Sequence, residues 1–319
     1  MDRTNIMVTK PKDQGSRARI LDSIAVKLID GASKLFENRS LESAERLGIL
    51  VAKLVQRCDR KHRERTLSNL ELAFPEWSAT QRKEIANKMY CHFGRVVGDF
   101  LKAEQTTDEQ ILSHTEVIGL ENLEEAESLN CGIIAITGHI GNWERMSQWM
   151  GATNRKLSVI ARDANQGVLQ DRVIRLRQSK GARVLSRGAA ARGSLVALKR
   201  NEMVGILPDQ NASEMFIPFF GMNSGWVRGP GVLHKSTGAP VLPAFCIWTS
   251  PGHYRLEILP MLTPNPEIDV VEGIMIEIAK ALEHEIRQYP EQWLWMHDRW
   301  KSGRQQASGL QQLANEGLK

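Results

Sequence analysis

The sequence predicts an α/β fold: a mixed, mostly parallel central sheet flanked by helices, with a helical N-terminal region before it. Two observations support this. Beyond about residue 110, short apolar runs typical of buried strands alternate with longer segments whose apolar residues recur at helical spacing. Such alternation is typical of βαβ units, in which successive strands run parallel. Before residue 110 the periodicity is almost entirely helical.

The N-terminal region divides into a tail and several expected helices. Residues 1–19 are polar and basic, with a Pro and a Gly, and are expected to be a disordered tail. From Ile20 to Phe36 the apolar residues follow helical spacing, with Lys27 and Lys34 off the apolar stripe. Such a helix either lies in a membrane interface or packs on the domain, and both readings stay open. Helices are also expected over 41–56 and 80–102, which makes 20–110 a helical, membrane-association candidate region.

The segment from 111 to 303 is expected to form the α/β core. Strands are expected at 115–119, 132–137, 157–161, 183–186, 203–207, 241–248 and 254–259, and helices at 144–151, 166–180, 194–200 and 271–288. Residues 304–319 are polar and are expected to form a C-terminal tail.

Composition limits the classes of partner and site. The 319 residues carry a net charge of +5, which favours anionic partners as much as it favours simple solubility. The four cysteines are scattered, so the sequence contains no zinc-like cluster, and a reducing compartment fits best. Aromatic residues do not interleave the basic runs, which argues against nucleic acid as a partner. The sequence contains no secretory signal and no run long enough to span a bilayer.

One stretch, Cys131–Glu144, combines the features of an active site. An apolar strand from Gly132 to Thr137 ends at Gly138-His139, and Trp143-Glu144 opens a helical pattern. Polar chemistry in open α/β sheets lies at such strand ends, and a His held by a carboxylate is a general base near neutral pH. The spacing itself is expected about once by chance among eight histidines and 37 acidic residues, so the context carries the argument. The alternative is a His that caps a turn and a Glu favoured by the helix dipole.

An ordered series of motifs resembles the bacterial lipid A late acyltransferases (lauroyl and myristoyl transferases) of the lysophospholipid acyltransferase superfamily. The series spans about residues 60–300 and comprises Asn69-Leu-x-Leu-Ala-Phe-Pro75, Gly138-His139-x-Gly141-Asn142-Trp143-Glu144, Ala161-Arg162, Leu207-Pro208-Asp209-Gln210, Pro218-Phe219-Phe220-Gly221, Gly229-Pro230 and Pro290–His297.

The resemblance implies an O-acyl transfer. A hydroxyl of a lipid A precursor or related glycolipid would attack an acyl thioester, with His139 as the general base and Glu144 orienting and stabilising the imidazolium. The donor would be acyl-carrier protein, which is typically acidic, or coenzyme A. The thioester is a co-substrate, so neither cofactor nor metal is needed. Other acceptors stay open (an ornithine lipid, a glycerophospholipid or a secondary metabolite), and a non-catalytic basic binding module is a remote alternative.

The resemblance also assigns supporting residues. Backbone N–H groups of Gly141, Asn142 and Trp143 would stabilise the negative thioester oxygen, although Asn142 is equally expected to be the helix N-cap. Arg162 either binds a phosphate of the glycolipid or of the phosphopantetheine arm, or is an ordinary surface arginine. Asp209 or Gln210 would contact the head group or merely close a turn.

The roles of two further motifs stay open. Pro218–Gly221 would line an acyl channel or belong to ordinary core, and His297 and Arg299 would touch phosphate or be structural. Asp298 stands where family members often have Arg. Many members begin with a hydrophobic anchor that this sequence does not contain. We therefore expect a peripheral or monotopic protein on the cytoplasmic face of the bacterial inner membrane, with an anionic membrane surface and a phosphorylated glycolipid as partners.

Overall fold

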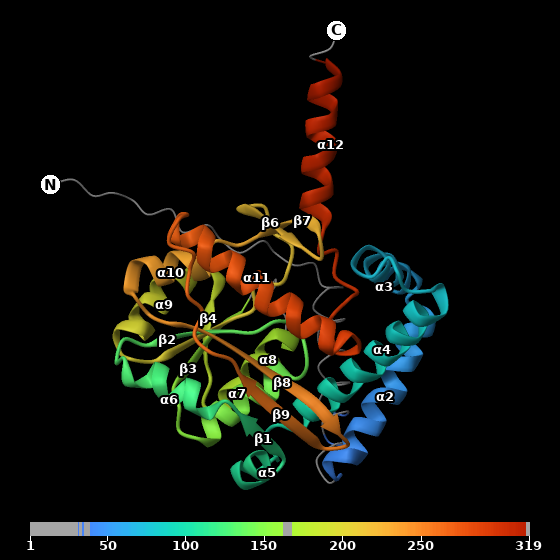
Figure 1. Cartoon of the computed structure of the whole chain (residues 1–319). Coiled ribbons are helices and arrows are strands. Elements are labelled where there is room, and N and C mark those ends of the chain that lie inside the picture. Colours follow the sequence, from blue (N-terminus) through green and yellow to red (C-terminus); the bar gives the residue numbers. More distant parts are fainter. Residues whose placement is uncertain (1–30, 32–33, 35–38, 162–167, 317–319) are drawn as a thin grey trace, which may run out of the picture.

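A seven-stranded sheet forms the centre of the computed structural model, which describes residues 31, 34, 39–161 and 168–316 (Figure 1). The strand order is β1-β9-β8-β2-β5-β3-β4. Strands β8 to β4 in this order pair in parallel, whereas β9 runs antiparallel to β8 and parallel to β1. The predicted mixed, mostly parallel sheet is therefore confirmed. The strands are β1 (Thr115–Ile118), β2 (Ile133–Ile136), β3 (Leu157–Ala161), β4 (Arg183–Ser186), β5 (Met203–Ile206), β8 (Val241–Ser250) and β9 (His253–Ile258).

Helices cover both faces of this sheet, because its central strands are apolar on both sides. In β2 every residue is buried, and Ile133 packs in one core cluster while Ile134 and Ile136 pack in the other. The cluster around Ile133 holds residues of α5 (Asp108–Ser113), α6 (Leu120–Ser128) and α7 (Trp143–Ala152). The other cluster holds residues of α9 (Ala190–Lys199), α10 (Gly229–Thr237) and α11 (Val270–Gln288).

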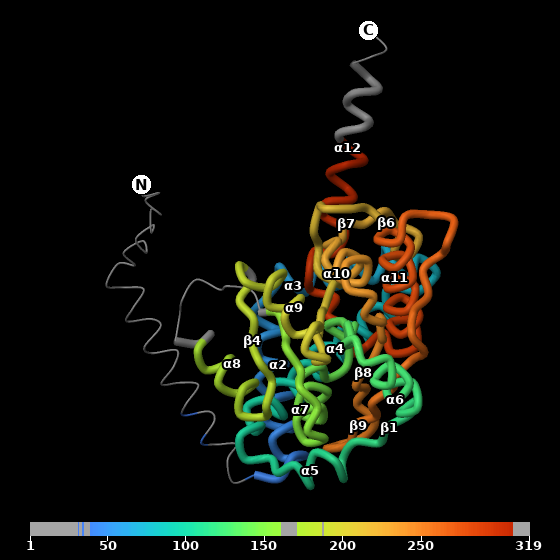
Figure 2. Tube along the Cα trace, turned by 90° about the vertical axis from the view of Figure 1, so that its left-hand side faces the viewer, coloured from blue at the N-terminus to red at the C-terminus, as the bar shows by residue number. Residues whose placement is uncertain are grey.

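Further elements after residue 110 lie outside the seven-stranded sheet. They are α8 (Val168–Gln178), the antiparallel hairpin of β6 (Met215–Phe219) and β7 (Met222–Trp226), α12 (Lys301–Glu316) and two short 3-10 turns, η1 (Arg187–Ala189) and η2 (Pro290–Gln292). Helix α12 projects away from the rest of the molecule in both views (Figures 1 and 2). The boundary expected after residue 303 falls inside α12, and the one expected after residue 110 falls inside α5.

Three N-terminal helices pack beside the sheet: α2 (Leu41–Cys58), α3 (Arg60–Ala73) and α4 (Ala79–Leu101). Glycines bring α2 and α4 into backbone contact, since a Cβ added to Gly48 would lie 1.9 Å from the carbonyl oxygen of Gly94. On α3, the amide of Asn69 donates to the carbonyls of Trp295 and His297, both at 2.7 Å, and so ties this region to the segment before α12.

Two expectations for the N-terminus concern residues outside the description: the tail at 1–19, and all of the Ile20–Phe36 helix except Gly31 and Lys34. Over the described ranges, no helix is both long enough and apolar enough to cross a bilayer.

Candidate active site

The strand order brings His139 and Asp209 together. Strands β2 and β5 are neighbours in parallel, with Ile136 paired to Ile206. His139 lies three residues beyond the end of β2 and Asp209 three residues beyond the end of β5. The carboxyl ends of parallel strands share one edge of a sheet, so both side chains reach the same place.

Asp209 holds the imidazole of His139 in one orientation. Its Oδ1 accepts from Nδ1 of His139 at 2.8 Å, and its Oδ2 accepts from the backbone N–H of His139 at 2.7 Å and from the indole of Trp293 at 2.9 Å. Burial alone would raise the pKa of Asp209, but His139 and the indole donor outweigh it and hold this pKa at about 2. The carboxylate is therefore ionised at neutral pH and can only accept hydrogen bonds.

This contact sets the chemistry of the second imidazole nitrogen. Because Nδ1 carries the proton that Asp209 accepts, Nε2 of the neutral ring keeps its lone pair. The side-chain nitrogen of Gln210 lies 3.3 Å from Nε2. The side chain of His139 is 19% exposed, so a substrate hydroxyl has access to it. Asp209, expected to contact a head group or close a turn, is instead the orienting carboxylate of His139.

Glu144 occupies a different place from the one expected. Its carboxylate forms an ion pair with Arg177 of α8, with Nη2 to Oε1 at 2.5 Å, and accepts from the indole of Trp143 at 3.0 Å. The indole lies edge-on to His139, with ring centroids 5.1 Å apart. Glu144 therefore does not orient the imidazole directly, contrary to the expectation from the sequence. It is the second residue of α7, its carboxylate pairs with Arg177 of α8, and the indole of Trp143 lies between it and His139.

The backbone N–H groups of Gly141 and Asn142 both donate to carbonyls within the protein, so neither is available to a substrate. The Gly141 N–H donates to the carbonyl of Gln292 at 3.0 Å, and the Asn142 N–H donates to that of Cys246 at 2.6 Å. The expected role of these two N–H groups at a thioester oxygen is therefore wrong, because both already have carbonyl partners. The N-cap alternative is confirmed, since Oδ1 of Asn142 accepts from the Arg145 N–H at 3.0 Å. Gly141 has φ of 59°, and a Cβ there would meet the Cys246 oxygen at 2.1 Å.

A buried ion pair lies beneath this turn. Asp99 of α4 accepts from the Asn142 amide at 2.7 Å and from the guanidinium of Arg145, and the side chains of Asp99 and Arg145 are both fully buried. Removing one partner of a buried pair leaves an uncompensated charge in the interior. The network therefore fixes the start of α7, and through it the turn that follows His139.

We expect Asp99→Ala to lower the free energy of unfolding by about 3–5 kcal/mol, because it strands the Arg145 guanidinium. Urea unfolding followed by circular dichroism measures this loss. The control is Glu84→Ala, which removes an exposed pair with Lys88 and should leave stability nearly unchanged. Equal, small losses in both variants would show that Asp99 does not anchor the turn.

Two other predicted motifs contribute to the protein interior rather than to a substrate site. Phe219 and Phe220 are buried and pack edge-on, which supports the core alternative for that motif. Arg299 is fully buried; it donates to the Gly225 carbonyl at 2.5 Å and stacks over Trp226, so it offers no surface to a phosphate.

His297 and Arg162 complete the predicted set. Nε2 of His297 accepts from the Asn211 N–H at 2.9 Å, and burial is the main cause that lowers its pKa. Arg162 lies outside the described residues. Between 39 and 161 and between 168 and 316, no group of three or more His, Cys, Asp or Glu residues is placed to hold a metal ion.

Three residues that support the site were not identified from the sequence. Asp99 accepts from the Asn142 amide, Arg177 pairs with Glu144, and Trp293 donates to Asp209. Each had a weak signal. Asp99 was noticeable only as the acid four residues after Arg95, Arg177 as part of a basic helix, and Trp293 as one tryptophan of the final motif. Their roles depend on contacts between elements far apart in the chain, which local patterns do not encode.

Comparison with known proteins identifies the family of the chain. A model of the bacterial lipid A biosynthesis acyltransferase family matches residues 36–302. The lipid A biosynthesis lauroyltransferase of Escherichia coli (strain K12) is 29% identical over 266 residues, covering 81% of this chain and 85% of that protein. The palmitoleoyltransferase of the same strain is 28% identical over 239 residues, covering 73% and 77%. The phosphatidylinositol mannoside acyltransferase of Mycobacterium tuberculosis (strain ATCC 25618 / H37Rv) is 24% identical over 192 residues, covering 57% and 58%. The chain is an acyltransferase and belongs to the bacterial lipid A biosynthesis acyltransferase family.

Proposed function

We propose that this acyltransferase moves a fatty acyl chain from acyl-carrier protein to a hydroxyl of a lipid A precursor, with His139 as the general base. One observation carries the mechanism: the buried Asp209 carboxylate accepts from Nδ1 of His139, so Nε2, which the Gln210 amide contacts at 3.3 Å, keeps the lone pair that accepts a proton. This replaces the His139–Glu144 dyad with a His139–Asp209 pair.

The reaction then follows in two steps. The acceptor hydroxyl gives its proton to Nε2 while its oxygen attacks the thioester carbonyl, forming the C–O bond of a tetrahedral intermediate. The intermediate collapses, the C–S bond breaks, and the sulfur leaves as a thiol with the proton from Nε2. The ionised Asp209 stabilises the imidazolium between the two steps. No acyl-enzyme forms, because the acceptor oxygen is itself the nucleophile.

Gln210 is our candidate donor for the negative thioester oxygen. The N–H groups of Gly141 and Asn142 are occupied, whereas the Gln210 amide lies next to Nε2. A donor there would face the oxygen on which charge develops. In this proposal Glu144 and Arg177 are positioning residues that act through the indole of Trp143.

The acceptor and the donor are supported by separate observations. The names of the relatives that cover most of the chain specify lipid A biosynthesis, which supports a lipid A precursor as the acceptor. We further propose that the transfer takes place on the cytoplasmic face of the bacterial inner membrane. The net charge of +5 supports an anionic donor such as the acidic acyl-carrier protein. Similarity to a phosphatidylinositol mannoside acyltransferase makes another phosphorylated lipid the second candidate acceptor.

The test presents the purified chain with each donor and acceptor in turn. Donors are acyl-carrier protein and coenzyme A thioesters of several chain lengths; acceptors are a lipid A precursor, a phosphatidylinositol mannoside and an ornithine lipid. Mass spectrometry should show one added acyl group on the lipid A precursor, formed fastest from the carrier-protein donor. Acylation of another acceptor alone would overturn the proposed substrate, and thioester hydrolysis without any acylated lipid would overturn the proposed transfer.

A further inference from the structure

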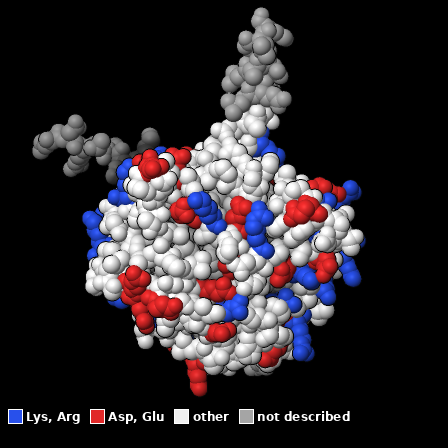
Figure 3. Space-filling view, viewed as in Figure 1, with Lys and Arg blue, Asp and Glu red and all other residues white. Residues whose placement is uncertain are grey.

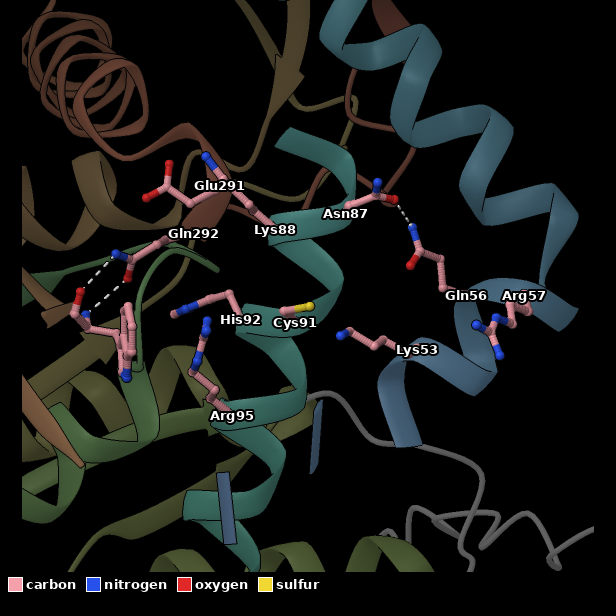
Figure 4. A pocket seen from close by; sticks show the side chains of 11 residues that line it. Lys53, Gln56, Arg57, Asn87, Lys88, Cys91, His92, Arg95, Glu291 and Gln292 are labelled. Atoms are coloured by element: carbon pink, nitrogen blue, oxygen red, sulfur yellow. Dashed lines mark hydrogen bonds between the residues drawn. The ribbon is translucent and has the colours of Figure 1, made fainter. Parts of the chain in front are cut away.

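A basic pocket of about 710 Å³ opens over α4, with α2 on one side and Trp248 of β8 and η2 on the other; His139 does not line it. Lys53 and Arg57 enter it from α2, Lys88 and Arg95 from α4, and Glu291 lies on its rim (Figure 4). We propose that this pocket binds the phosphate of an anionic membrane phospholipid and so docks the enzyme on the bilayer. The pocket contains neither His139 nor Asp209, and two of its lining residues, His92 and Gln292, hydrogen-bond to Gly141 in the turn after His139.

Charge is the first argument for this ligand. The pocket has four cationic side chains and one carboxylate. Among the described residues, Lys53, Arg57 and Arg95 have no carboxylate within ion-pair distance, whereas Lys88 is paired with Glu84 at 2.7 Å. The Arg95 guanidinium lies 4.0 Å over the ring of Trp248, which holds it in place. A phosphate is the anion that such preorganised guanidinium and ammonium donors bind well. On the face shown in Figure 3, the edge formed by α2, α3 and α4 carries Lys and Arg with Asp and Glu interspersed.

The outer surface of α2 distinguishes a lipid from other anions. Leu50, Val51, Leu54 and Val55 are between 48% and 65% exposed. Leu50 and Leu54 precede Lys53 and Arg57 by three residues each, so apolar and basic side chains are neighbours on the helix surface. A phospholipid carries its phosphate directly above apolar chains, which matches this arrangement. Docking of an acidic protein would use the cations but leave the four apolar side chains unexplained.

His92 on the inner wall supplies an unused hydrogen-bonding group. Its side chain is buried, and its Nε2 lies 3.0 Å from the Gly141 carbonyl, to which it donates, so Nδ1 is an acceptor without a partner. Burial lowers the pKa of His92 to about 4, which makes the ring neutral near pH 7. Nδ1 is closed to solvent in this structure, so a head-group hydroxyl, such as that of phosphatidylglycerol, reaches it only if the pocket wall shifts.

The experiment measures co-sedimentation of the full chain with two kinds of vesicle: phosphatidylcholine alone, and phosphatidylcholine mixed with phosphatidylglycerol. We expect tighter binding to the mixed vesicles. The Lys53→Gln/Arg57→Gln variant should lose about 30-fold in affinity for the mixed vesicles, because each basic residue near an anionic surface contributes about 1 kcal/mol. Leu50→Ser/Leu54→Ser should weaken binding to both kinds of vesicle.

A matched variant separates the pocket from general surface charge. Arg60→Gln/Lys61→Gln removes the same charge from exposed positions of neighbouring α3 that do not line the pocket. It should lose clearly less affinity for the mixed vesicles than Lys53→Gln/Arg57→Gln, because its two charges lie outside the pocket. His139→Ala, which keeps every basic residue of the pocket, should bind nearly as well as the wild type. Equal losses in the two charge variants would overturn the pocket as the site. Two results would overturn an anionic phospholipid as the ligand of the pocket: equal affinity of the wild type for both kinds of vesicle, or binding of acyl-carrier protein that depends on Lys53 and Arg57.

Discussion

Replacing His139 with alanine should lower kcat for acyl transfer by about 10²- to 10⁴-fold, the usual contribution of a positioned general base. The variant removes Nε2, which in our mechanism takes the proton of the acceptor hydroxyl and returns it to the leaving sulfur. KM for the acceptor should change little, because the imidazole contributes mainly in the transition state. Steady-state transfer, followed by mass spectrometry of the acylated lipid, measures the loss.

The control for this variant is His284→Ala. His284 is exposed on α11, where its ring contacts Gln288, and its removal should leave transfer unchanged. His284→Ala should unfold at the same urea concentration as the wild type. His139→Ala should remain folded without urea but unfold at a lower concentration, because it removes the Nδ1–H donor from the buried Asp209 carboxylate. A His139→Ala protein that is folded and transfers at the wild-type rate would exclude His139 as the base.

Asp209→Asn should lower kcat by about 10⁴-fold, as expected when the carboxylate of a His–Asp pair becomes an amide. Asp209 accepts hydrogen bonds on both oxygens, from His139 and from the indole of Trp293. An amide has one acceptor and one donor side. If its oxygen keeps the indole and the backbone N–H, its NH₂ group faces Nδ1, and the ring proton must move to Nε2, where it blocks proton abstraction.

Glu144→Gln is the matched comparison, because it makes the same chemical change at the other acid of the network. We expect a smaller loss of kcat, since Glu144 is linked to the imidazole only through Trp143 and is paired with Arg177. A larger loss in Glu144→Gln than in Asp209→Asn would restore Glu144 as the acid that serves His139 directly.

The difference between these two acids shows what sequence patterns can and cannot supply. His139 and Asp209 were each predicted to follow a strand, because apolar runs that end in Gly or Pro are visible locally. That β2 and β5 are neighbours was not predictable, since strand order depends on the packing of helices between distant segments. Glu144 was chosen because it is near His139 in the chain, whereas the acid near it in space lies 70 residues away.

Long-range contacts also determine whether the N–H groups of the Gly141 turn are available to a substrate. Its N–H groups looked free from the local pattern, but the carbonyls that occupy them belong to η2 and β8. Helix α3 escaped prediction for a different reason. Its charged N-terminal half lacks an apolar stripe, and burial of Leu70 and Ala73 against distant residues stabilises it instead. By contrast, strands β3 and β4 were placed correctly because their apolar runs are bounded by polar or turn-forming residues.

The most direct test of the account is the transfer rate of the His139→Ala/Asp209→Asn double variant, compared with the two single variants. If Asp209 acts only through the imidazole of His139, the second substitution has nothing left to disrupt. The account therefore predicts that the double variant transfers at the same rate as His139→Ala alone. Losses that multiply, so that the double variant is slower by the product of the two single effects, would contradict it.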